Sequence, residues 1–209
     1  MNELVRVALA KDQSTASSPE RSPWQVQIRR ARQALPAGAG VLCTDSHVMT
    51  CAHVIAPNGG APAGPVFVTF QFTGHHDPIP ATVIDNGWHP EGFDGSGDIA
   101  VVVLEQALPL GAEPAPLRDA GRVWEHRFRA YGYPQGHERN GVWSHGMMVG
   151  HSGLEWIQRE ADSSWGYQLQ KGFRGAPSGT TTSRRSSALS SPPTRWWRRA
   201  PAMASRLRS

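Results

Sequence analysis

The chain has 209 residues, about the size of a single domain, and 39% of them are hydrophobic, which is enough to build one core. Its 22 glycines and 17 prolines, set between short apolar runs, favour a turn-rich all-β fold over a helical one. No apolar stretch approaches the ~18 residues of a transmembrane helix. The first residues lack the apolar region of a signal peptide, so we expect a cytoplasmic protein.

The positive charge is confined to one end of the chain. Residues 183–209 contain seven arginines and no acidic residue, which leaves 14 basic against 17 acidic residues elsewhere, a net charge of −3. The overall charge of +4 therefore belongs to the tail and not to the folded part. A tail with seven arginines and two tryptophans can neutralise phosphates and stack on bases. The same composition, without hydrophobic periodicity, favours a disordered tail over nucleic-acid binding.

Residues 1–21 are polar and predict a flexible leader before the domain. Apolar and polar residues then alternate over 22–29, which is typical of a half-buried strand. Residues 38–54 predict a β-hairpin with its turn at 44–46. Pairing about this turn places Cys43 opposite His47 or Val48, so a disulfide with Cys51 is not expected, and both thiols are expected to be buried.

Further strands are expected along the rest of the chain. Six strands can be drawn between 23 and 119, and the Pro/Ala-rich segment 107–121 predicts a connection to a second unit. The strand at 97–105 is the most apolar, so we expect it to be central. The expected strands after the hairpin are 66–72, 81–84, 97–105, 128–134, 143–149, 154–158 and 167–169.

The hairpin carries a recognisable motif. The pattern Gly-x-Gly-Val-Leu, a short turn and Thr-x-Ala-His at 38–53 resembles the histidine-bearing segment of the trypsin-like serine proteases, the chymotrypsin superfamily, and in particular their bacterial cytosolic members. The resemblance implies an all-β fold of two six-stranded Greek-key barrels, the first at about 22–119 and the second at about 122–177. It also implies hydrolysis of peptide bonds in protein or peptide substrates without a cofactor or a metal.

The resemblance implies roles for individual residues. His53 takes the place of the general base, and Asp98, in an Asp-Ile-Ala sequence that opens a strand, takes the place of the carboxylate that orients it. Asp94 is the alternative carboxylate, but it lies in a predicted loop. A second histidine cluster, at 75–77, has no paired motif, so a solvated loop is favoured over a metal site there.

The sequence departs from the family at the nucleophile. The family frame Gly-x-Ser-Gly-x-Pro is represented by residues 172–177, Gly-Phe-Arg-Gly-Ala-Pro, so Arg174 stands at the serine position. A guanidinium is permanently protonated and cannot attack a carbonyl. The backbone N–H groups of Gly172 and Arg174 are still expected to form the oxyanion hole. Ser178 is not a substitute, because it is expected to start the next strand.

We therefore expect the chain to be inactive as a protease with this sequence. The alternative is that it functions as a non-catalytic pseudoprotease, a binding module that does not cleave what it binds. The family's apolar strands are also missing after 177, so the second barrel is expected to be incomplete. Residues 178–209 are predicted to be disordered, and their Arg, Ser, Pro and Trp excess suggests a frameshift in GC-rich DNA near codon 177 or 178. Substrate specificity and oligomeric state do not follow from the sequence.

Overall fold

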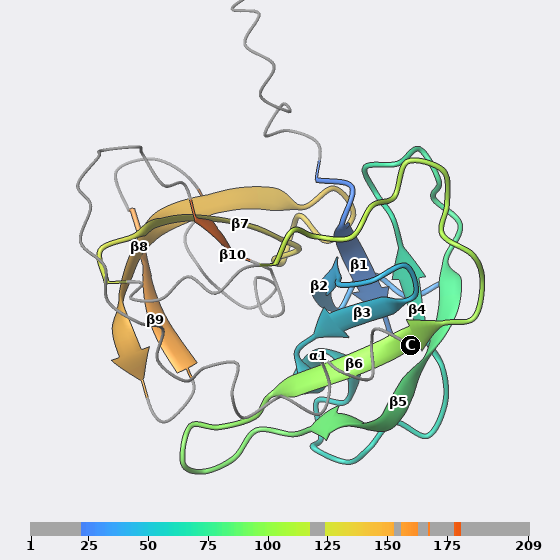
Figure 1. The fold of residues 1–209 in the computed structure, drawn as a ribbon, viewed down its shortest axis with the longest axis horizontal. Coiled ribbons are helices and arrows are strands. Elements are labelled where there is room, and N and C mark those ends of the chain that lie inside the picture. The colour runs from blue at the N-terminus through green and yellow to red at the C-terminus, as the bar shows by residue number, and fades with distance from the viewer. Residues whose placement is uncertain (1–21, 118–123, 153–155, 163–166, 168–177, 181–209) are drawn as a thin grey trace, which may run out of the picture.

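The computed structural model describes residues 22–117, 124–152, 156–162, 167 and 178–180. Over these residues the fold is all-β with one short helix (Figure 1). The predicted leader and nearly all of the predicted tail lie outside the described residues.

The first unit is a closed antiparallel barrel of six strands in the order β1-β2-β3-β6-β5-β4. This confirms the expectation of six strands in the first half of the chain. The elements are β1 (Gln25–Arg29), β2 (Gly38–Leu42), β3 (His47–Thr50), α1 (Ala52–Ile55), β4 (Val66–Thr69), β5 (Ile79–His89) and β6 (Ile99–Leu104).

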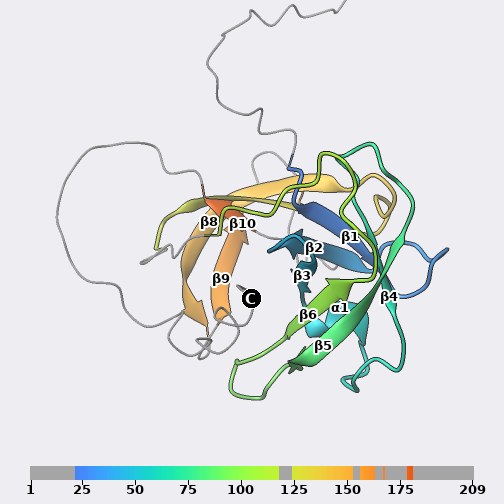
Figure 2. The same ribbon diagram turned by 45° about the vertical axis from the view of Figure 1, so that its right-hand side comes forward.

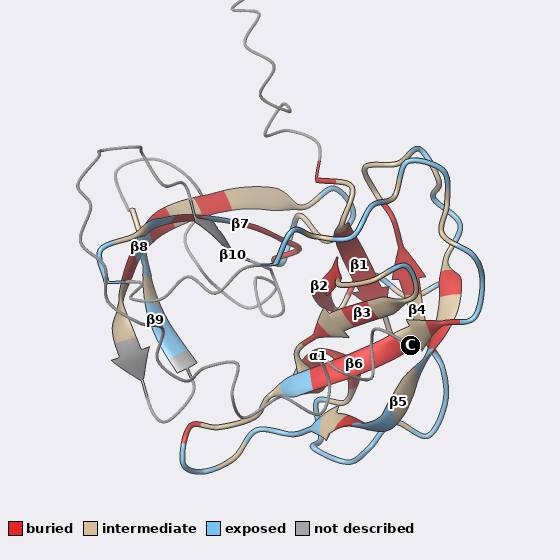
Figure 3. Ribbon diagram, in the orientation of Figure 1, coloured by how far each residue is buried: buried red, intermediate tan, exposed pale blue. Residues whose placement is uncertain are grey.

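The barrel is filled by β-branched and aromatic side chains. Val26 and Ile28 of β1, Val68 of β4 and Val102 of β6 are fully buried, and Phe70 is the largest side chain with no exposed surface. The strand expected to be central, β6, pairs with β3 and β5, but in a closed barrel every strand has two such neighbours, so none is central. Figure 3 shows the buried residues gathered on the barrel strands.

The second unit is smaller. It is a sheet of four strands in the order β10-β7-β8-β9 in the described part of the chain, namely β7 (Arg127–Gly132), β8 (Val142–Ser152), β9 (Trp156–Ala161) and β10 (Ser178–Thr180). Its core contains Phe128, Ala130 and Met148. The expected second barrel of six strands is therefore represented by a partial sheet. Tyr167 lies outside any strand, although a strand was predicted at 167–169.

The prediction of disorder from residue 178 onward is wrong for the first three residues of the tail. Ser178, Gly179 and Thr180 form β10, which pairs antiparallel with β7. The prediction failed because these polar residues have no hydrophobic pattern of their own; pairing with β7 satisfies their backbone instead. The boundary of the folded domain thus lies beyond 177.

The two units lie side by side (Figure 2), and polar side chains tie them together. The side-chain amide of Gln27 in β1 donates to Gln71 Oε1 at 3.2 Å and to the carbonyl oxygen of Arg139 at 3.1 Å. Gln71 Nε2 donates to the carbonyl oxygen of Asn140 at 3.0 Å, and the Tyr133 hydroxyl donates to Gln71 Oε1 at 2.8 Å. These bonds hold the β7–β8 loop against the first barrel.

Two further sequence expectations can be compared with the fold. Among the described residues, no helix is long and apolar enough to span a membrane. Neither cysteine forms a disulfide, as expected, and the Cys43 N–H donates to the carbonyl oxygen of His47 across the turn. The two thiols are half-buried, however, and not fully buried as expected.

Candidate active site

The histidine hairpin ends in a short helix that carries His53. Strands β2 and β3 pair with Gly40 opposite Thr50, and the buried Thr50 hydroxyl donates to the carbonyl oxygen of Ala39 at 2.7 Å. Cys51 is the N-cap of α1, in an extended conformation. The Arg30 guanidinium donates to the carbonyl oxygens of Val54 and His53 at 2.9 and 3.4 Å. The sequence predicted the hairpin but not this turn of helix.

Asp98 lies directly before β6 and faces His53. Its backbone has a φ of +60°, and Gly97 before it has a φ of +76°. These two left-handed residues turn the chain sharply before it enters the barrel. The turn places the Asp98 carboxylate 2.8 Å from His53 Nδ1 through both of its oxygens, and Oδ1 also accepts the backbone N–H of His53 at 3.1 Å.

The site is only partly shielded from solvent. The side chains of His53 and Asp98 are 23% and 17% exposed. Burial by itself would raise the pKa of the Asp98 carboxyl, but the hydrogen bonds and the charge of His53 outweigh it, so this pKa lies below its ordinary value. Asp98 is therefore ionised at neutral pH, and it holds the Nδ1 proton of the imidazole. No described residue makes a hydrogen bond to Nε2, which leaves that nitrogen available to a third group.

The alternative carboxylate, Asp94, is not part of this arrangement. It is exposed, and its Oδ1 accepts hydrogen bonds from the hydroxyl and the N–H of Ser96 at 2.6 and 3.2 Å. These hydrogen bonds lower the pKa of Asp94 and keep it within its own loop. Asp98, and not Asp94, is the carboxylate that pairs with His53.

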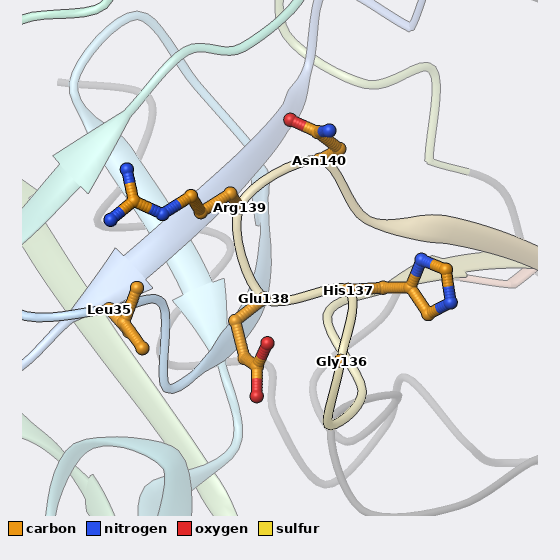
Figure 4. Close-up of a pocket in the computed structure, with 6 residues that line it drawn as sticks. All are labelled: Leu35, Gly136, His137, Glu138, Arg139 and Asn140. Atoms are coloured by element: carbon orange, nitrogen blue, oxygen red, sulfur yellow. The ribbon is translucent and has the colours of Figure 1, made fainter.

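A separate cavity lies between the β1–β2 loop and the β7–β8 loop. Its volume is about 360 Å³, and Leu35 and residues 136–140 line it (Figure 4). The side chains of His137 and Arg139 point in opposite directions in this view. The cavity does not include His53 or Asp98. It is a polar recess where the two units meet.

Residues 38–182 match the trypsin-like peptidase domain. The chain belongs to the trypsin-like peptidase family. The match spans more than half of the chain and includes His53, Asp98 and the segment 172–177. No curated protein matches the chain.

Solved structures support the fold of this trypsin-like peptidase domain. Kallikrein-related peptidase 10, in a complex with Zn²⁺, is 18% identical with a TM-score of 0.55, and the alignment covers 76% of each chain. The MamO protease domain of Magnetospirillum magneticum is 16% identical with a TM-score of 0.51, covering 76% of this chain and 78% of that chain. At these identities the likeness concerns the fold alone.

The predicted nucleophile segment cannot be placed in the site. Gly172 and Arg174 lie outside the described residues. The described chain resumes at Ser178, the first residue of β10, opposite Ala130 of β7. Ser178 is thus the start of a strand, as the family resemblance implied, although composition predicted disorder from this residue onward.

Sequence reasoning missed Cys51 in this trypsin-like peptidase domain. It was expected to be a buried apolar residue, but it is half-buried, and its thiol contributes to the lowered pKa of the Asp98 carboxyl. Cys51, His53 and Asp98 together offer ligand atoms that all lie within 4.8 Å of one another. The position of Cys51, two residues before His53 in the hairpin motif, is the signal that could have indicated this contact.

Arg159 was also missed. It lies on β9, and its guanidinium carbon is 5.7 Å from the centre of the Phe128 ring. Burial lowers the pKa of this arginine, and its electrostatic interaction with Cys51 partly offsets that shift. The guanidinium thus packs over Phe128, a core residue of the second sheet.

Proposed function

We propose that this chain is a serine-type endopeptidase by descent, in which the nucleophile position is occupied by Arg174, so that it is inactive as written. His53 is proposed as the general base and Asp98 as the residue that fixes its tautomer and stabilises the imidazolium. The observation that carries the proposal is the 2.8 Å contact between His53 Nδ1 and the Asp98 carboxylate within a trypsin-like peptidase domain.

This geometry can supply the acid–base half of acyl transfer. With Nδ1 held by Asp98, the lone pair of Nε2 points away from the carboxylate and can accept the proton of a hydroxyl. What the chain lacks in the family frame at 172–177 is that hydroxyl, because residue 174 is arginine. The N–H groups of Gly172 and Arg174 are proposed as the oxyanion hole, which needs backbone groups only and tolerates any side chain at 174.

The proposed substrates are peptides and proteins, as the family implies. Without a nucleophile the domain would bind a polypeptide segment and release it uncleaved, as a pseudoprotease does. A basic tail that binds nucleic acid is the weaker alternative, because its composition, without hydrophobic periodicity, favours disorder.

The test is the substitution Arg174→Ser in the full chain. We expect the wild-type chain to be unreactive with a fluorophosphonate probe and the variant to be labelled at the introduced serine. Adding His53→Ala should abolish labelling, and adding Asp98→Asn should lower the rate by about 10⁴-fold, since an amide in place of the carboxylate favours the wrong tautomer.

Two results would contradict different parts of the proposal. Labelling of the wild-type chain at any serine would show that a nucleophile exists elsewhere. Absence of labelling in Arg174→Ser, in a protein whose His53 still shows the hydrogen-bonded Nδ1 proton by nuclear magnetic resonance, would show that residue 174 is not the nucleophile position.

A further inference from the structure

Three potential metal-ligating side chains meet beside the hairpin. Cys51 is the N-cap of α1, His53 lies on its first turn, and Asp98 approaches from the start of β6. Their ligand atoms lie within 4.8 Å of one another, and all three residues are half-buried. Within the part of the chain that the structure describes, no other group of three His, Cys, Asp or Glu side chains meets this criterion.

The chemistry of this donor set fits a particular class of cation. One sulfur, one imidazole nitrogen and one carboxylate oxygen are ligands that Zn²⁺ takes at about 2.0–2.3 Å. In a tetrahedral site such ligands lie about 3.3–3.8 Å from one another, as follows from those bond lengths. The present separations run from 2.8 Å for Nδ1 to the carboxylate up to the 4.8 Å limit, so small side-chain rotations suffice. Partial exposure leaves the fourth position to water.

The surrounding charges are compatible with binding. The Asp98 carboxyl is ionised at neutral pH because its pKa is lowered. With a thiolate and a carboxylate among the ligands, the two negative charges would balance the charge of a divalent cation.

We propose that Cys51, His53 and Asp98 form a zinc-binding site that competes with the His53–Asp98 hydrogen bond. The inference goes beyond the proposed function, because metal binding needs no nucleophile at position 174.

Occupancy of the site has a defined proton balance. Zinc displaces the proton of the Cys51 thiol, which is released to solvent. The proton on His53 Nδ1 is replaced by the metal, and the neutral imidazole then carries its proton on Nε2. In that tautomer Nε2 is a donor and cannot accept the proton of a hydroxyl. Zinc would therefore switch off the general base that the same histidine provides in a chain with a serine at 174.

The first measurement is a titration of the full wild-type chain with Co²⁺, a spectroscopic substitute for zinc, followed by competition with Zn²⁺. We expect one equivalent to bind, with visible bands of a tetrahedral ion and a thiolate-to-cobalt charge-transfer band in the near ultraviolet. Cys51→Ala should lose the charge-transfer band and weaken binding by about 100-fold or more, since loss of even a supporting group costs 10–100-fold.

The chain offers matched controls. Cys43→Ala removes the other cysteine, whose Sγ lies 3.4 Å from the carbonyl oxygen of Val41, and it should leave the titration unchanged. The double substitution His75→Ala/His76→Ala removes the histidine pair of the β4–β5 loop, and it should also change nothing. Cys51→Ser replaces the thiol with a hydroxyl of similar size, so it reports loss of the sulfur ligand with little change in packing.

Nuclear magnetic resonance of the imidazole gives a readout independent of cobalt. Zinc should shift the His53 proton from Nδ1 to Nε2 in the wild-type chain and not in Cys51→Ala. Sub-stoichiometric binding, a charge-transfer band that survives in Cys51→Ala or Cys51→Ser, or a band that disappears in Cys43→Ala would each overturn the proposal. Zinc binding without a tautomer change at His53 would overturn it as well.

Discussion

Gly97 is the residue whose replacement should most directly separate Asp98 from His53. It has a φ of +76°, and a Cβ atom there would lie 2.3 Å from the backbone carbonyl oxygen of Pro90. Alanine in the left-handed region costs about 1–2 kcal/mol. Overpacking against backbone adds about 1–3 kcal/mol, because a carbonyl cannot rotate away as a side chain can. We therefore expect Gly97→Ala to lower the free energy of unfolding by about 2–5 kcal/mol.

Gly74 provides the matched control for this prediction. It has a φ of +78°, but a Cβ atom there would meet nothing within 4 Å. Gly74→Ala should therefore cost only the conformational term, about 1–2 kcal/mol. The difference between the two variants isolates the clash with Pro90. Urea denaturation followed by tryptophan fluorescence measures both free energies.

The same variant tests how the candidate site is positioned. A backbone shift at Gly97 moves Asp98, so the downfield resonance of the His53 Nδ1 proton should weaken or disappear in Gly97→Ala and persist in Gly74→Ala. Equal destabilisation of the two variants would refute the clash argument. An unchanged Nδ1 resonance in Gly97→Ala would refute the claim that this glycine sets the position of Asp98.

Three further predictions concern the barrel core, the contact between the units and a thiol. Phe70→Ala should lower the free energy of unfolding in urea by about 3–5 kcal/mol, because Phe70 is fully buried. Phe93→Ala, at a fully exposed side chain, should change it by no more than about 0.5 kcal/mol. Equal effects of the two substitutions would contradict the place of Phe70 in the barrel core. Gln71→Ala should lower the free energy of unfolding by about 1–3 kcal/mol, because it leaves the Tyr133 hydroxyl and the β7–β8 loop without their hydrogen-bond partner. Gln158→Ala, at an exposed side chain, should have little effect. An unchanged stability of Gln71→Ala would mean that other contacts join the two units. Burial raises the pKa of the Cys43 thiol to about 11, so about 0.1% of it is thiolate at pH 8. In a Cys51→Ala chain, where Cys43 is the remaining thiol, the rate of alkylation should therefore rise about tenfold per pH unit up to about pH 11. An alkylation rate in the folded chain equal to the rate in urea would refute the burial of this thiol.

The sequence indicated the first barrel well because its signals are local. The hairpin at 38–54 has apolar strand residues on both sides of a polar turn, and the run 99–104 is too apolar to be solvated, so its place between β3 and β5 could be expected. The order and spacing of His53 and Asp98 likewise indicated a pair, and the structure places them 2.8 Å apart.

Other features depend on residues that are distant in the chain. Strand β10 is polar and exists through its pairing with β7, so no local pattern could predict it. The same applies to Gln27 and Gln71, whose side-chain amides donate to the carbonyl oxygens of Arg139 and Asn140 in the β7–β8 loop and so join the two units. Asp94 and Asp98 also differ by tertiary placement, since only one of them faces His53.

The sequence by itself determined the family motif, the identity of residue 174 and the six strands of the first barrel, because motif and hydrophobic period are properties of consecutive residues. Tertiary structure decided which carboxylate pairs with His53 and what Cys51 contacts. Both depend on how the turn at Gly97 and Asp98 brings the start of β6 against α1, and a contact made across 45 residues of chain leaves no trace in local composition.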